Sequence, residues 1–170
     1  SWNIQDPSMV ASLFRETLSI YCGGSDNLYR HHDYSIAILE SLRPYPMARF
    51  WLHGNHLSID GKKMSKSRGN ILYTDDLLTR GYTAAEVRFF LIAGHYRERL
   101  AYTERAMQAA AEQLREVRGI VRALGARAGQ AAPLADGRSR RVEALFRRGM
   151  DRDLQVKEAI DGISGELAAV

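Results

Sequence analysis

Residues 60–70 read Asp60-Gly61-Lys62-Lys63-Met64-Ser65-Lys66-Ser67-Arg68-Gly69-Asn70, and this stretch carries the strongest signal in the chain. The chain has 24 basic residues, but only four of them are lysines, and three of those four lie within five positions of this stretch. Lysine is a compact, mobile point charge that can follow a phosphate group through a reaction, whereas a surface that needs only charge would use arginine here. The clustering therefore indicates phosphate chemistry, and the alternative is an ordinary solvated turn.

The residues just before the lysines predict a hairpin. Leu57-Ser58-Ile59 alternates between apolar and polar side chains and is followed by Asp60-Gly61, a favoured two-residue hairpin turn. The lysine cluster should therefore lie on a loop just beyond a strand.

The first third of the chain predicts alternating helices and strands. Asp6-Pro7 is typical of a helix start, with Asp6 as the N-cap and Pro7 at the first helical position. The apolar stretch 18–21 runs into Gly23-Gly24, which predicts a strand followed by a glycine-rich turn. Residues 32–42 suit a short helix that must end before Pro44.

The second half of the chain predicts mainly helices. Thr83 and Glu86 form a capping box ahead of an apolar run. Beyond Thr103 the apolar residues repeat every three or four positions, which predicts a helix of about 20 residues. A small-residue connection from Gly125 to Gly137 and two further amphipathic helices follow. The fold class is therefore α/β, with a mixed α/β organisation over residues 1–100 and an incomplete helical bundle over residues 101–170.

Composition excludes several classes of protein. With 45% hydrophobic and 26% charged residues, the chain is too apolar to be disordered. No apolar run approaches the roughly 20 residues of a membrane-spanning helix, so no membrane partner is expected. The single cysteine, Cys22, excludes a disulfide framework and fits a reducing, cytoplasmic location. The chain begins with Ser1 rather than Met, which favours a piece of a longer protein.

Residues 63–67 read Lys-Met-Ser-Lys-Ser, the complete KMSKS signature of class I aminoacyl-tRNA synthetases. The motifs around it resemble the cysteinyl-tRNA synthetase family in order and approximate spacing, over nearly the whole chain. They include Trp2-Asn3-Ile4-Gln5-Asp6, Gly23-Gly24-Ser25-Asp26, His31-His32, Phe50-Trp51-Leu52-His53, Val87-Arg88-Phe89-Phe90-Leu91 and His95-Tyr96-Arg97. The resemblance implies the second half of a Rossmann-like catalytic domain.

The same resemblance implies an activity and a set of site residues. In this family, an amino acid and ATP, with Mg²⁺, form an aminoacyl-adenylate and pyrophosphate, and the acyl group then passes to tRNA. Lys63 and Lys66 match the catalytic lysines, and Trp2 and His53 match amino-acid-binding positions. The implied ATP-binding residues are Gly23, Gly24, Asp26, Lys63, Met64, Ser65, Lys66 and Ser67. Taken alone, the two glycines are more typical of an ordinary strand-to-helix turn.

Two departures from the family matter. The other class I signature, His-x-Gly-His, is absent, so the segment is expected to be inactive by itself. The segment His53-Gly54-Asn55-His56 is not that signature, because its glycine is in the wrong position. His56 is therefore interpreted as a surface or hairpin residue. Three of the positions that hold zinc in the family carry Asp6, His31 and Ser35. Serine is a poor zinc ligand and a usual thiolate is missing, so we expect no metal ligands and no tight zinc.

These departures leave several functions open. The chain is interpreted as part of an ATP-dependent ligase of the cysteinyl-tRNA synthetase type. The alternatives are a paralogue that has lost cysteine specificity, a ligase that joins cysteine to an amino sugar in mycothiol synthesis, and a catalytically silent module that binds tRNA or a protein. The altered zinc positions favour the paralogue over strict cysteine activation. Tyr21 and Cys22 replace the family's usual histidine and glycine, so altered amino-acid and adenosine pockets are expected as well. The intact lysine signature argues against the silent module.

Overall fold

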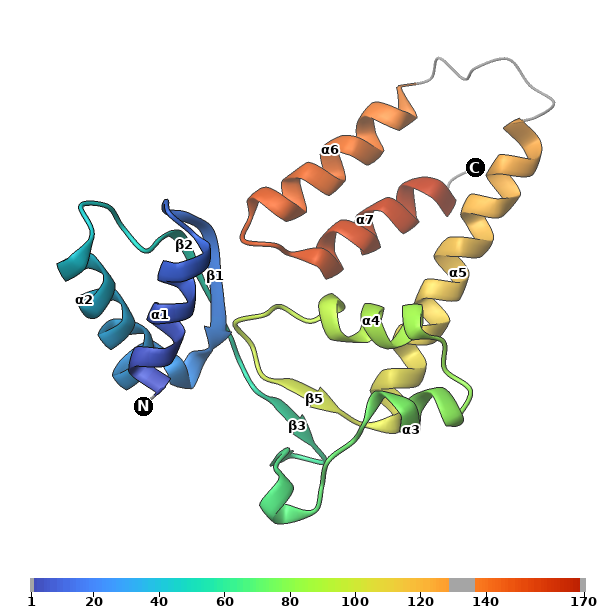
Figure 1. Ribbon diagram of the computed structural model, residues 1–170. Coiled ribbons are helices and arrows are strands. Elements are labelled where there is room, and N and C mark those ends of the chain that lie inside the picture. Colours follow the sequence, from blue (N-terminus) through green and yellow to red (C-terminus); the bar gives the residue numbers. More distant parts are fainter. Residues whose placement is uncertain (1, 129–136, 169–170) are drawn as a thin grey trace. The chain divides into compact units, whose positions relative to one another are not determined.

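The computed structural model describes residues 2–128 and 137–168 (Figure 1). The chain divides into two compact units, and each is described by itself. Unit 1 comprises residues 1–56 and 96–99, and unit 2 comprises residues 57–95 and 100–170. The assignment of residues 1–100 and 101–170 as two domains stays a prediction. Among the described residues, none of the helices combines the length and apolarity needed to span a membrane.

Unit 1 is built around two parallel strands. Strand β1 (Leu18–Gly24) pairs with β2 (Ala48–Gly54), and the register places Gly23 opposite His53 and Gly24 opposite Gly54. Parallel pairing requires a crossover, and here it consists of the turns η1 (Ser25–Asn27) and η2 (Leu28–His32) and helix α2 (Asp33–Leu42). The predicted strand and the predicted helix that ends before Pro44 are both confirmed. The strand continues through Gly23 and Gly24, so the predicted turn begins only at Ser25.

The first helix of unit 1 corrects the predicted helix start. Helix α1 spans Trp2–Leu13, so Asp6 is not an N-cap and Pro7 is not the first helical residue. Pro7 lies inside the helix, where it lacks the N–H that would bond to the carbonyl of Asn3. The carboxylate of Asp6 instead meets His31, 2.9 Å away on a different element. Asp6 therefore bonds to a distant side chain and not, as predicted, to the backbone N–H groups at the start of its own helix.

Unit 2 begins with the predicted hairpin. Strands β3 (Leu57–Ile59) and β4 (Lys62–Lys63) pair antiparallel, and β5 (Leu100–Tyr102) pairs parallel to β3 on the other side, which gives the order β4-β3-β5. The turn residues Asp60 and Gly61 both have positive φ, 47° and 76°. Two positive φ values are what a tight hairpin turn with this sequence requires.

Five helices complete the described part of unit 2. Helix α3 (Thr74–Thr79) precedes α4 (Ala84–Ala93), whose capping box between Thr83 and Glu86 is present as predicted. Their core, together with β5 and the start of α5 (Glu104–Ala128), is formed by Leu77, Val87, Phe90, Tyr102, Met107 and Ala111. Helix α6 (Arg138–Asp151) packs on α7 (Val156–Ala168), and α7 also contacts α5, so the predicted helical bundle is confirmed.

The boundary of the long helix differs from the prediction. Helix α5 has 25 residues and continues through Gly125 to Ala128, so the predicted connection does not begin at Gly125. A single glycine costs a helix only about 1 kcal/mol, and the alanines and arginines around it are good helix formers. Most of the predicted connection, residues 129–136, lies outside the described residues.

Candidate active site

The carboxyl ends of β1 and β2 bring several predicted site residues together in unit 1. The parallel register places Gly23 and Gly24 beside His53 and Gly54, and Asp26 follows in the next turn. The side chain of Asp26 is 55% exposed and contacts His56, with 3.2 Å between Oδ2 and Nε2. His56, interpreted from the sequence as a surface or hairpin residue, therefore contacts a predicted nucleotide-binding carboxylate.

Both glycines have a structural reason to lack a side chain. A Cβ atom on Gly23 would lie 2.4 Å from Cε1 of His32, and one on Gly24 would lie 2.6 Å from Oδ1 of Asp26. These distances are shorter than an ordinary non-bonded contact between a Cβ atom and another heavy atom. The glycines thus let His32 and Asp26 lie directly against the end of β1.

His32 is a candidate site residue that the sequence analysis did not single out. Its side chain is almost completely buried, and its Nδ1 lies 2.7 Å from Nε2 of His53. The rings of Tyr21 and Trp51 lie 5.2 and 5.3 Å from its ring. Burial lowers the pKa of His32, and the neighbouring His53 and His31 lower it further. The His31-His32 pair was the only sequence signal, and it did not reveal which ring faces the interior.

The three family zinc positions form a hydrogen-bonded group. Nε2 of His31 lies 2.9 Å from Oδ2 of Asp6, and its Nδ1 lies 3.0 Å from Oδ1 of Asn3, so both ring nitrogens have a partner. Ser35 is fully buried, and its hydroxyl donates to the carbonyl oxygen of His31 at 2.9 Å. The part of the chain that the structure describes contains no group of three His, Cys, Asp or Glu side chains that could hold a metal. These donors do not fit a zinc site, because a neutral hydroxyl stands where an anionic ligand is needed.

Trp2, the other predicted amino-acid-binding residue, lies at the start of α1 and is 72% exposed. His53, by contrast, is partly buried and bonded to His32. The two residues therefore differ in how firmly the surrounding unit holds them.

The lysine signature lies in unit 2. Lys63 is on β4, and Lys66 and Ser67 begin the short 3₁₀ turn η3 (Lys66–Arg68), with all three side chains exposed. Met64 and Ser65 are partly buried between them. The turn ends at Gly69, whose φ of 65° is a conformation that glycine adopts readily. The predicted site residues thus fall into two groups, one in each unit.

Comparisons with known proteins show the family of the chain. The family described as "tRNA synthetases class I (C) catalytic domain" matches residues 1–112. The chain is 42% identical to the cysteine--tRNA ligase of Chlamydia pneumoniae, over 91% of this chain and 33% of that protein. It is 34% identical to the cysteine--tRNA ligase of Solibacter usitatus, over 95% of this chain and 35% of that protein. The chain thus spans about a third of the length of these relatives.

The fold is also found in a solved structure. The crystal structure of the Agrobacterium radiobacter K84 agnB2 LeuRS-tRNA-LeuAMS ternary complex matches 89% of this chain and 22% of that chain, with a TM-score of 0.66 and 18% sequence identity. At this identity the match shows the fold alone. From the family match and these relatives, we conclude that the chain belongs to the cysteinyl-tRNA synthetase family, in its class I catalytic domain.

Proposed function

We propose that the chain is the lysine-loop part of the catalytic domain of an ATP-dependent ligase that activates an amino acid, cysteine in the first instance, and transfers it to tRNA. The observation that carries the proposal is the complete lysine signature on a hairpin, with Lys63 and Lys66 both exposed to solvent. Family membership supports it. Because the chain spans about a third of its relatives, the activity is proposed for the complete product of its gene.

In the proposed reaction, the carboxylate of the amino acid attacks the α-phosphorus of ATP. The bond from that phosphorus to the bridging oxygen breaks, pyrophosphate leaves, and an aminoacyl-adenylate forms. A hydroxyl of tRNA then attacks the acyl carbon, and AMP leaves with the bonding electron pair. Mg²⁺ arrives on the ATP phosphates and needs no dedicated protein cage.

Lys63 and Lys66 are assigned to the departing pyrophosphate. Negative charge grows on this group in the transition state, so an ammonium group that meets it there stabilises the transition state more than bound ATP. Both side chains are exposed to solvent, which supports this role. Met64, Ser65 and Ser67 are assigned to the same ATP-binding loop.

The end of β1 is assigned to the nucleotide's adenosine part. Asp26 can accept hydrogen bonds from ribose hydroxyls, and its contact with His56 would fix the orientation of the carboxylate. Gly23 and Gly24 keep the end of the strand free of side chains where the backbone would approach the nucleotide. His53 and Trp2 are assigned to the amino acid, and the bond from His53 to His32 holds its ring in place.

A second candidate function is a paralogue that activates an amino acid other than cysteine. It is favoured by the direct contact between Asp6 and His31 and by the buried Ser35, which together replace the metal-binding groups that would recognise a thiolate. With no metal held at these positions, a thiolate would lose the interaction that distinguishes it from a neutral polar group.

Exchange of labelled pyrophosphate into ATP, measured with the complete gene product and each amino acid in turn, tests both functions. Stimulation by cysteine alone would support the first, and stimulation by another amino acid would support the second. Transfer of the labelled acyl group to tRNA, rather than to an amino sugar, would identify the acceptor. Absence of exchange with every amino acid would contradict both functions and favour a silent binding module.

A further inference from the structure

Asn70 makes two hydrogen bonds to the backbone of the first half of the lysine signature, at Lys63 and Ser65. Its Oδ1 accepts from the backbone N–H of Ser65 at 3.0 Å, and its Nδ2 donates to the carbonyl oxygen of Lys63 at 3.2 Å. The two backbone groups lie on either side of Met64. The side chain of Asn70 therefore accepts from one backbone N–H and donates to one backbone carbonyl, as a residue of a neighbouring strand would do.

Other contacts fix the rest of the loop. The N–H of Met64 bonds to the carbonyl of Leu57 at 3.4 Å and so prolongs the pairing of β3 with β4. The N–H of Gly69 bonds to the carbonyl of Lys66 at 3.1 Å, which closes the turn η3. The side chain of Asn70 adds a third set of contacts, because it bonds to the backbone of Lys63 and Ser65.

The amide of Asn70 suits both bonds because it donates and accepts at once. A carboxylate of the same size accepts but cannot donate, and an alanine does neither. Since each such bond contributes about 1 kcal/mol net, the pair is strong enough to change the ratio of loop conformations by more than about tenfold. It is not strong enough to lock a loop that must move during a reaction.

We propose that Asn70 is a positioning residue that holds the loop of Lys63 and Lys66 in its observed conformation before ATP binds. The inference rests on the proposed function of the two lysines. It adds that the side-chain amide of Asn70 orders the loop that carries them. Asn70 acts through the backbone of Lys63 and Ser65 and does not itself touch the reacting atoms. Preordering lowers the cost of placing charged groups against a developing charge.

The first test is hydrogen exchange of individual amides in the 170-residue chain. In Asn70→Ala, the Ser65 amide should exchange at least about fivefold faster, because it loses its acceptor. In Asn70→Asp it should stay slow, because a carboxylate oxygen can still accept. The amide of Phe90 in the core reports whether each variant is folded.

Asn55 provides a matched control for the exchange measurement. Its Oδ1 accepts from the N–H of His56 at 2.8 Å, and its Nδ2 donates to the carbonyl of Arg97 at 3.3 Å, so it also bridges two backbone groups. Asn55→Ala should leave the Ser65 amide unchanged. An unchanged Ser65 amide in folded Asn70→Ala would overturn the proposal, whatever the activity.

The second test is pyrophosphate exchange by the complete gene product. Both Asn70→Ala and Asn70→Asp should lower kcat by about tenfold while the KM for ATP changes less than about twofold, because the loop is misplaced in the transition state more than in the bound state. The positioning role would be refuted if Asn70→Ala speeds exchange of the Ser65 amide but leaves kcat unchanged, while Lys63→Ala lowers kcat. If Lys63→Ala is also without effect, the proposed function of the loop fails, and the inference fails with it.

Discussion

The two lysines are the residues on which the proposed chemistry depends most. We expect Lys63→Ala or Lys66→Ala in the complete gene product to lower the rate of adenylate formation about 10²–10³-fold, the usual effect of losing one preorganised group that stabilises a transition state. The affinity for ATP should change less, because the pyrophosphate charge develops only during the reaction. Single-turnover kinetics and equilibrium binding measure the two effects separately.

Lys157 offers a control for these substitutions. It lies on α7 and bonds to Asp161 at 2.6 Å, four residues away on the same helix. Lys157→Ala should leave adenylate formation unchanged, because an exposed pair of this kind contributes little even to stability. If Lys63→Ala and Lys66→Ala both stay within twofold of the wild-type rate, the assignment of the lysines is wrong.

Gly23 should tolerate no side chain. Gly23→Ala would place a methyl group 2.4 Å from the ring of His32, which is buried and bonded to His53. We expect a loss of about 1–3 kcal/mol in the free energy of unfolding, the usual cost of overpacking. Urea denaturation measures this loss.

Gly119 serves as the matched control, since it lies within α5 and a Cβ there would meet no atom within 4 Å. Gly119→Ala should stabilise the chain by about 0.5–1 kcal/mol, because alanine favours a helix over glycine. Equal unfolding midpoints for Gly23→Ala and wild type would show that the end of β1 is looser than the contact with His32 implies.

The chain should hold no tight zinc. Asp6 and His31 are bonded to each other, and Ser35 supplies no anionic ligand. Metal analysis after dialysis against a mild chelator should find far less than one zinc per chain. The double variant Asp6→Cys with Ser35→Glu should retain more zinc, because it adds a thiolate and a carboxylate beside His31. One zinc per wild-type chain, lost in Asp6→Ala, would overturn this expectation and favour cysteine over any other amino acid as the substrate.

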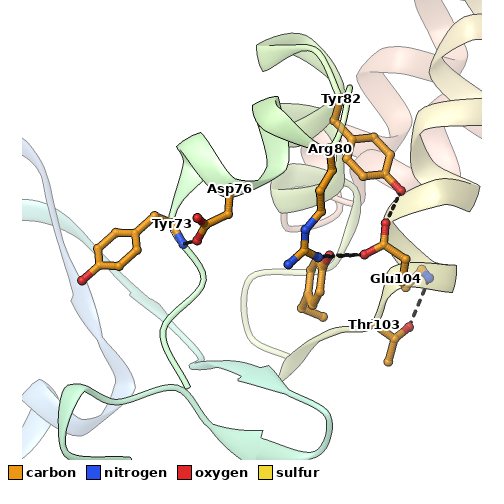
Figure 2. A network of polar contacts seen from close by, with 8 residues as sticks. Tyr73, Asp76, Arg80, Tyr82, Thr103 and Glu104 are labelled. Atoms are coloured by element: carbon orange, nitrogen blue, oxygen red, sulfur yellow. Dashed lines mark hydrogen bonds and ion pairs between the residues drawn. The ribbon is translucent and has the colours of Figure 1, made fainter. Parts of the chain in front are cut away.

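At the scale of elements, Glu104 joins the start of α5 to the turn between α3 and α4 (Figure 2). Its carboxylate accepts from the hydroxyls of Tyr102 and Tyr82, at 2.7 and 2.8 Å, and from Nη1 of Arg80 at 3.0 Å. The Tyr102 bond, then the Tyr82 bond, lower the pKa of Glu104 below its ordinary value of 4.5. Burial, followed by the contact with Glu104, raises the pKa of Tyr102 to about 12.

These pKa shifts predict how stability depends on pH. A carboxylate whose pKa is lowered by folding contributes stability that is present above its unfolded value of 4.5 and is lost as the pH falls below it. The free energy of unfolding should therefore drop more steeply below pH 4.5 in wild type than in Glu104→Gln. The difference should be under about 1 kcal/mol, because the side chain is half exposed and water screens its charge.

Urea denaturation at several pH values checks this prediction. Glu143→Gln removes an exposed carboxylate that pairs with Arg147 on the same helix, and it should follow the wild-type pH curve. If the curves of wild type and Glu104→Gln run parallel from pH 7 downward, the network does not couple α5 to the rest of unit 2.

At the scale of the whole molecule, any binding of tRNA by this chain alone should be weak and salt-sensitive. The helical region carries several arginines, but in its described part many of them pair with glutamates: Arg115 with Glu86, Arg138 and Arg141 with Glu166, Arg147 with Glu143 and Arg152 with Glu158. Arginines engaged in this way have fewer donors left for phosphates. Fluorescence titration with tRNA should show micromolar or weaker binding that is lost as salt rises. Tight, salt-resistant binding to one tRNA would contradict this expectation.

The sequence by itself determined the features that depend on neighbouring residues. The hairpin turn at Asp60-Gly61 and the capping box of Thr83 and Glu86 formed as predicted, because each is decided within four residues of chain. The family was also readable, since the lysine signature is a contiguous motif. The predicted helix start at Asp6 was wrong. The capping preference of Asp6, about 1 kcal/mol, competed with its distant partner His31.

Only the tertiary structure decided which side chains meet across the chain. His32 reaches His53 over 21 residues, Asp6 reaches His31 over 25, and Tyr82 reaches Glu104 over 22. Periodicity and capping rules carry no information about such pairs, because they describe one element at a time. The pairs arise when β1 and β2 align in parallel and when α5 packs beside α4, and burial then fixes which ring or carboxylate faces which partner.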